Sequence, residues 1–125
     1  MKVPENLLYT KEHEWVIQEN NSVKVGITDF AQSQLGDIIF LELPELGDQI
    51  IAGESFGEIE AVKTVSELYA PIDGTILEVN EDLEDSPDNI NQDCYGKGWI
   101  IKVSCEGDIK SNDLLDHKAY SKLIE

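Results

Sequence analysis

Short runs of alternating apolar and polar residues recur along this chain, and they constrain its fold more than any other feature. A period of two places the apolar side chains on one face of a β-strand. The runs that read as half-buried or more fully buried strands are residues 23–27, 38–41, 56–62, 75–79 and 99–101. Turn residues separate them at 46–48, 52–54 and 71–74. Many short strands at regular spacing predict a mainly β fold, a compact sandwich or barrel.

Helix signals are few. Thr28 or Asp29 can cap a short helix that runs through Leu35 and ends at Gly36, and residues 87–91 fit a single turn. The last 14 or so residues predict a second helix. Its candidate caps are Ser111, Asn112 and Asp113, and its apolar face would consist of Leu114, Leu115, Tyr120, Leu123 and Ile124. The acidic run 81–85 lacks the glycine-punctuated pattern of a calcium loop, so we expect a solvated loop there.

The length and apolar content fit one domain that spans residues 1–125. A chain of 125 residues with 41% apolar side chains can bury about two-thirds of the surface that it exposes when unfolded. No linker, low-complexity tract or clear repeat interrupts it.

The charge balance excludes several classes of partner. The chain has 26 acidic and 9 basic residues, a net charge of -17, and every basic residue is a lysine. Nucleic acids and anionic membranes need clustered positive charge, so neither is an expected partner. A strongly acidic surface instead steers a protein toward basic patches on other proteins.

The N-terminal segment carries no apolar core of a signal peptide, and no apolar run approaches the length of a membrane span. A cytoplasmic location is the expectation. Cys94 and Cys105 would then be reduced, with a disulfide as the alternative.

Residues for catalysis are scarce. The chain has two histidines, His13 and His117, and no second cluster of cysteine and histidine with the spacing of metal ligands. It also lacks a serine nucleophile motif and the glycine-rich phosphate loops. We therefore expect a non-catalytic protein with no metal, while a small metal-dependent enzyme that uses His13 remains an alternative.

The segment 57–74 is the most informative. Strand-like residues run up to Val62 and resume after Thr64, which predicts a β-hairpin with Lys63 at its tip. A lysine amine on a flexible stem can be acylated, and Glu60 and Glu67 flank it where they can orient a modifying enzyme. The alternative is an ordinary solvated lysine between two glutamates.

Residues 60–74, E-A-V-K-T-V-S-E-L-Y-A-P-I-D-G, closely resemble the lipoyl-attachment segment of glycine cleavage H proteins. Further pieces resemble that family in the same order, over roughly residues 6–125. These are H-E-W at 13–15, G-I-T-D-F-A at 26–31, L-G-D at 35–37, L-P at 43–44, E-V-N at 78–80 and G-K-G-W-I-I-K-V at 96–103.

This resemblance implies a barrel-sandwich hybrid of short antiparallel strands, a monomer, and a covalent lipoyl group (lipoate) on Lys63 that a lipoylating enzyme attaches. It also implies a carrier that takes an aminomethyl group from glycine decarboxylase (P protein) to the aminomethyltransferase (T protein). Dihydrolipoamide dehydrogenase (L protein) would then reoxidise the arm. Glu14 matches a polar residue of the cleft that shields the loaded arm, and a carboxylate there favours the cationic aminomethyl amine.

One position departs from the family pattern. Gln34 stands where many members have histidine. Glutamine keeps the hydrogen-bonding capacity of this position but has no titratable group.

Three other readings stay open. The chain can be a lipoyl donor or relay for subunits of 2-oxo acid dehydrogenases, or an unmodified protein-interaction module. A biotinyl carrier ranks lower, because its M-K-M motif is replaced here by Val62-Lys63-Thr64.

Overall fold

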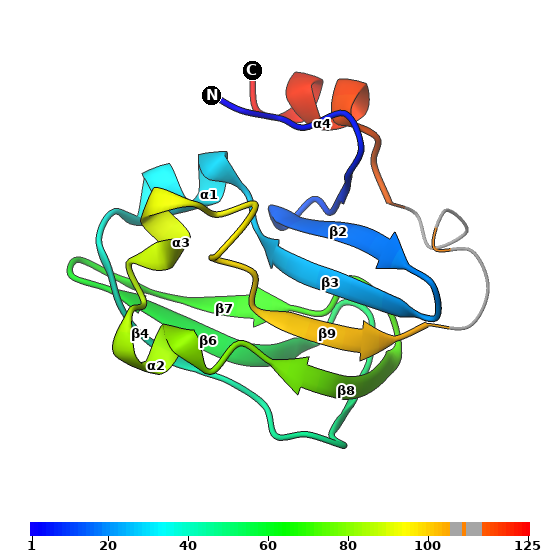
Figure 1. The fold of residues 1–125 in the computed structure, drawn as a ribbon. Coiled ribbons are helices and arrows are strands. Elements are labelled where there is room, and N and C mark those ends of the chain that lie inside the picture. Colours follow the sequence, from blue (N-terminus) through cyan, green and yellow to red (C-terminus); the bar gives the residue numbers. More distant parts are fainter. Residues whose placement is uncertain (106–108, 110–113) are drawn as a thin grey trace.

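The computed structural model describes residues 1–105, 109 and 114–125, and within them the chain forms two antiparallel sheets (Figure 1). The larger sheet has six strands in the order β1-β2-β3-β9-β8-β5, and the smaller has three in the order β4-β6-β7. The strands are β1 (Leu8–Tyr9), β2 (Glu14–Glu19), β3 (Ser22–Ile27), β4 (Ile38–Glu42), β5 (Gln49–Ile50), β6 (Ser55–Ala61), β7 (Val65–Tyr69), β8 (Gly74–Val79) and β9 (Ile101–Ser104).

The core lies between the two sheets. Val25 and Ile101 of the larger sheet and Ile59 and Leu68 of the smaller one belong to a single buried apolar cluster. Across the described residues the strands form two packed layers rather than one closed barrel. The predicted mainly β, antiparallel architecture is confirmed.

Most predicted strands are present, and the alternation explains them. In β3 the side chains of Val23, Val25 and Ile27 are buried while Lys24 between them is half-exposed. The run at 99–101 was placed two residues too early, since β9 begins at Ile101. Even so, Ile100 N already donates to Val25 O at 2.8 Å, so the chain joins the sheet just before the regular strand.

The helices are α1 (Asp29–Leu35), α2 (Asp82–Asp85), α3 (Asn89–Gln92) and α4 (His117–Leu123). Helix α1 begins and ends as predicted. The Thr28 hydroxyl accepts a hydrogen bond from Ala31 N at 3.1 Å, and Gly36 follows the helix with φ of 81°. That positive φ is the reason a glycine ends this helix.

Two predictions for the second half of the chain were inexact. The acidic run 81–85 is not a loop, because residues 82–85 form the single helical turn of α2. Leu83 in this turn is buried. Helix α4 is shorter than expected and begins after Asp116, whose Oδ1 accepts from Ala119 N at 2.8 Å. The predicted caps Ser111, Asn112 and Asp113 lie outside the described residues. Helix α3 overlaps the turn predicted at 87–91.

Helix α4 covers the N-terminal strands. The Tyr120 ring stacks on the Tyr9 ring with centroids 4.5 Å apart, and Leu115 pairs with Tyr9 through two backbone hydrogen bonds. Both cysteines are buried and Cys94 is a free thiol, so the two do not form a disulfide with each other. In the described part of the chain no helix is long and apolar enough to cross a membrane.

Candidate functional site

The predicted hairpin is present, with Lys63 in its turn. Strands β6 and β7 are joined by three residues, and Ala61 N donates to Thr64 O at 2.8 Å across the turn. A second bond ties the turn to the rest of the protein, because Val62 N donates to the carbonyl of Asp37 at 3.0 Å. Lys63 is exposed on a turn that is fixed from two sides.

The Lys63 side chain lies against the end of helix α1. A Cβ atom built on Gly36 would sit 3.3 Å from Lys63 Cε and 3.6 Å from Nζ. The residue that ends α1 therefore also leaves room for the lysine stem, a contact that the sequence did not reveal.

Glu60 and Glu67 flank Lys63 in sequence and share the outer face of the small sheet. Glu60 is half-buried opposite Val65, and Glu67 is exposed opposite Glu58. Both point away from the core, because their neighbours Ile59 and Leu68 point into it. The Glu67 carboxylate accepts a hydrogen bond from Tyr69 Oη at 3.0 Å.

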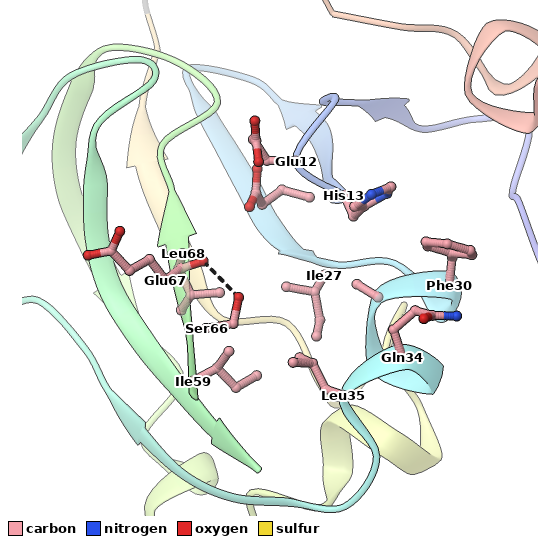
Figure 2. Close-up of a pocket in the computed structure, with 12 residues that line it drawn as sticks. Glu12, His13, Ile27, Phe30, Gln34, Leu35, Ile59, Ser66, Glu67 and Leu68 are labelled. Carbon is pink, nitrogen blue, oxygen red and sulfur yellow. Dashed lines mark hydrogen bonds between the residues drawn. The ribbon is translucent and has the colours of Figure 1, made fainter. Parts of the chain in front are cut away.

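A cavity of about 280 Å³ lies on the inner side of this sheet, between β2, β3, α1 and the β6–β7 hairpin (Figure 2). Its lining residues are Glu12, His13, Glu14, Ile27, Phe30, Ala31, Gln34, Leu35, Ile59, Ser66, Glu67 and Leu68. Figure 2 shows the Glu67 carboxylate directed away from the cavity, so this residue contributes its backbone.

The cavity is apolar inside and polar at its edge. Ile27, Leu35 and Ile59 form much of the wall, and the exposed Gln34 stands beside Phe30 on α1. Leu35 directly precedes Gly36, against which Lys63 rests, so the cavity begins next to the lysine stem.

Glu14 is the buried ionisable group of this site. It is only 2% exposed, so it is not a surface glutamate although it stands at the start of strand β2. One carboxylate oxygen accepts from Thr10 Oγ1 at 2.6 Å, and the other accepts from Tyr69 N at 3.4 Å in the opposite sheet. Burial raises the pKa of Glu14 to about 8, and the negative charge of Glu12 adds to this rise. Glu14 is therefore mostly protonated at neutral pH.

His13 stands at the cavity edge in an unusual backbone conformation, with φ of 71°. Its Nδ1 lies 2.8 Å from the Tyr120 hydroxyl, which is 2.7 Å from the hydroxyl of Thr28 at the start of α1. Burial lowers the pKa of His13. Among the described residues no three histidine, cysteine or acidic side chains gather as metal ligands. The His13 ring packs near Phe30, with centroids 4.9 Å apart.

The structure thus brings Glu14 and Gln34 to one cavity and places Lys63 next to it, while Glu60 and Glu67 face outward. Sequence reasoning missed Phe30, Ile59 and Ser66 as lining residues, and the link from His13 through Tyr120 to Thr28. The alternation of β6 and β7 was the available signal for Ile59 and Ser66, because it sets which side chains face inward.

Comparison with known proteins agrees with this geometry. A family model described as glycine cleavage H-protein matches residues 7–125. The glycine cleavage system H protein of Staphylococcus carnosus strain TM300 is 52% identical over 124 residues, which cover 99% of this chain and 98% of the relative. That of Oceanobacillus iheyensis strain HTE831 is 49% identical over 125 residues and 100% of this chain, or 99% of the relative.

A solved structure is also similar. The crystal structure of a glycine cleavage system H protein from Mycobacterium marinum superposes with a TM-score of 0.87 at 41% identity, covering 96% of this chain and 97% of that one. The chain belongs to the glycine cleavage H-protein family.

Proposed function

We propose that this protein is the lipoyl carrier of a glycine cleavage system and that Lys63 is the residue that carries the lipoyl group. The observation that supports this most directly is the placement of Lys63. Lys63 is exposed on a turn that two backbone hydrogen bonds fix, and its side chain lies beside Gly36, next to an apolar cavity with a buried carboxyl group. Family membership supplies the chemistry that fits this arrangement.

The residues present fit a lipoyl group. An amide on Lys63 Nζ needs an accessible primary amine, and this one is exposed. An arm with an apolar ring needs an apolar place to rest, and the walls of Ile27, Leu35 and Ile59 offer it within the 280 Å³ cavity. When bound, the lipoyl group supplies a disulfide that accepts an aminomethyl unit and is afterwards reoxidised.

The protein's own residues handle the charge of such cargo. A protonated Glu14 tolerates an apolar neighbour at neutral pH, since no buried charge is left unpaired. An ammonium that enters the cavity favours the ionised carboxyl and lowers its pKa, because opposite charges stabilise each other. Glu14 then releases its proton to solvent and its carboxylate pairs with the ammonium, while the backbone N–H of Tyr69 and the hydroxyl of Thr10 hold the carboxylate in place.

Gln34 keeps a hydrogen-bonding side chain at the cavity edge without a titratable proton. We therefore assign Gln34 a positioning role and place proton release at Glu14. The partners implied by this function are the P, T and L proteins of the system and the enzyme that lipoylates Lys63. The chain itself acts as a carrier component rather than an enzyme.

The test is mass spectrometry of the intact protein and its peptides, purified from cells supplied with lipoate. We expect one lipoyl amide on Lys63 in the unaltered protein and none in Lys63→Arg. The arginine variant should keep its fold, because the side chain is exposed, and should fail to support glycine cleavage.

An unmodified Lys63 in cells that lipoylate other proteins would contradict the proposal and favour the protein-interaction module. Glycine cleavage activity retained by Lys63→Arg would also contradict it.

A further inference from the structure

The outer face of the small sheet carries an arrangement that becomes visible only once the strand register is known. Three strands pair so that Glu42, Glu58 and Glu67 stand directly opposite one another across β4, β6 and β7. All three side chains are exposed. Neighbouring strands lie about 4.8 Å apart, so the backbone positions of these three residues follow one another across the sheet at about that spacing. We call these three residues the glutamate row.

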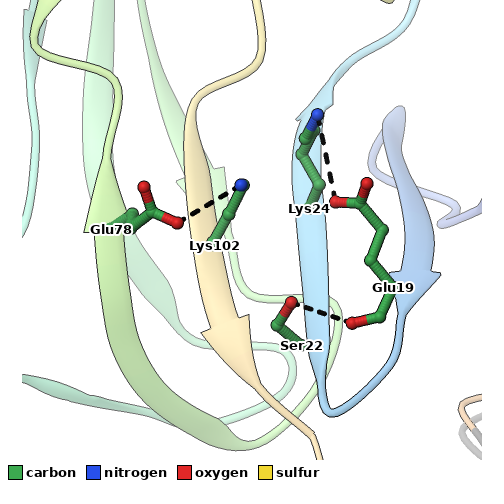
Figure 3. A network of polar contacts seen from close by, with 5 residues as sticks. All are labelled: Glu19, Ser22, Lys24, Glu78 and Lys102. Carbon is green, nitrogen blue, oxygen red and sulfur yellow. Dashed lines mark hydrogen bonds and ion pairs between the residues drawn. The ribbon is translucent and has the colours of Figure 1, made fainter.

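This row costs stability. Like charges directly opposite each other on paired strands are destabilising. The ion pairs found among the described residues are Lys24 with Glu19 and Lys102 with Glu78, and both lie on the larger sheet (Figure 3). Among the described residues, neither ion pair involves a member of the glutamate row.

Apolar side chains lie next to the row on the same face. The adjacent pairs across the three strands join Phe40, Glu60 and Val65, and the exposed fractions of Phe40 and Val65 are 57% and 54%. Beyond them, at the turn, Val62 is 72% exposed. An exposed apolar centre bordered by charge is typical of a protein-binding surface.

The outer face of the small sheet extends toward the turn that contains Lys63. Glu60 and Glu58 precede Lys63 by three and five residues. At about 3.4 Å per extended residue, their backbones lie within about 10 Å and about 17 Å of Lys63. The cavity lies on the opposite side of the same sheet, where Ile59, Ser66 and Leu68 point. A protein bound to the outer face thus contacts the hairpin that carries Lys63 and leaves the cavity free.

We propose that this outer face, with Phe40 and Val65 beside the glutamate row, docks the enzyme that lipoylates Lys63, through a complementary surface of lysine and arginine side chains around an apolar centre. The charge of the row selects a basic partner. The outer face and the cavity lie on opposite sides of the small sheet. This face therefore suits an enzyme that acts on the unmodified lysine better than one that must take a loaded arm out of the cavity. The inference rests on the proposed function.

The reaction that the docking serves is amide formation. A lipoyl carboxyl group activated with ATP as an acyl adenylate is attacked by the neutral Lys63 amine. The C–N bond forms as the C–O bond to AMP breaks, and the nitrogen loses a proton.

The test measures lipoylation of the unmodified full chain by a purified lipoate–protein ligase, with lipoate and ATP, as a function of carrier and salt concentration. We expect Glu42→Gln/Glu58→Gln to lower kcat/KM about tenfold through KM, with kcat unchanged, and to flatten its salt dependence. Isothermal titration of the ligase with the same proteins should show the matching loss of affinity without any turnover.

The matched control is Glu5→Gln/Glu125→Gln, which removes two exposed carboxylates near the chain ends. It should change kcat/KM less than twofold. For the apolar part, Phe40→Ser should weaken docking about fivefold, whereas Leu77→Ser on strand β8 should not; the two side chains are 57% and 47% exposed.

Several results would overturn the docking proposal. One is an equal kcat/KM for the glutamate-row variant and the unaltered protein. Another is an equal loss of kcat/KM in the control variant, because net charge alone would then explain the effect. Misfolding does not confuse the result, because removing opposed charges should raise the melting temperature. Failure of the unaltered protein to accept any lipoyl group would instead overturn the proposed function itself.

Discussion

Replacing Glu14 with glutamine should remove a specific pH dependence of stability. Burial raises the pKa of this carboxyl from its ordinary 4.5 to about 8. Between these values the unfolded chain releases the proton and the folded protein keeps it, so the free energy of unfolding falls as the pH rises. The shift from 4.5 to about 8, at about 1.4 kcal/mol per pH unit, totals about 5 kcal/mol.

The glutamine variant has no such proton to hold. Its amide oxygen can still accept from Thr10, while one of the two carboxylate bonds, the one from Tyr69 N, can be lost. That loss costs about 1 kcal/mol at every pH. Relative to the unaltered protein, the variant should therefore gain about 1.4 kcal/mol for each pH unit between 5 and 8.

Urea unfolding of both proteins at pH 5, 6, 7 and 8 measures this difference. The lowered pKa of His13 acts with the opposite sign, because it makes stability rise as the pH approaches the ordinary value of 6.5. Its contribution is common to both proteins and cancels in the difference. A difference that stays constant from pH 5 to pH 8 would refute the assignment of a protonated, buried Glu14.

Two further variants test the framework of the site. Tyr120→Phe removes the hydroxyl that contacts His13 at 2.8 Å, and we expect a loss of about 1–2 kcal/mol in urea unfolding; unchanged stability would show that this link carries no weight. Gly36→Ala and its control Gly53→Ala should each cost about 1 kcal/mol, since their φ values are 81° and 86°. Only Gly36→Ala should shift the NMR signals of the Lys63 side chain, which lies 3.3 Å from the added carbon, and equal shifts in both variants would contradict that contact.

The hairpin around Lys63 was readable from the sequence because its information is local. Alternating residues define both strands, and the break at Lys63-Thr64 defines the turn. The same holds for helix α1, where Thr28 and Gly36 mark the two ends. Caps and turns act within a few residues, so sequence pattern suffices for them.

The outer surface and the buried carboxyl were not readable, because both depend on long-range pairing. Strand β2 begins with three consecutive buried residues, so its burial does not alternate there. From sequence alone, a glutamate at this position looks like a surface residue. The glutamate row depends on irregular pairing at Ile38/Phe40 and at Ser55/Gly57, where the register shifts. A shift of one residue changes which side chains are opposite each other, and no local signal fixes that choice.

The two backbone hydrogen bonds that hold the turn have a consequence for movement. Because Ala61 and Val62 are hydrogen-bonded to Thr64 and Asp37, the backbone of Lys63 behaves as a fixed pivot. Any group joined to Lys63 then explores space by rotation about side-chain bonds, on a timescale of about picoseconds to nanoseconds for an exposed chain. The length of the joined group then sets how far it reaches from this pivot. Under the proposed function, the way each enzyme docks, and not motion of the hairpin, decides which enzyme receives the group.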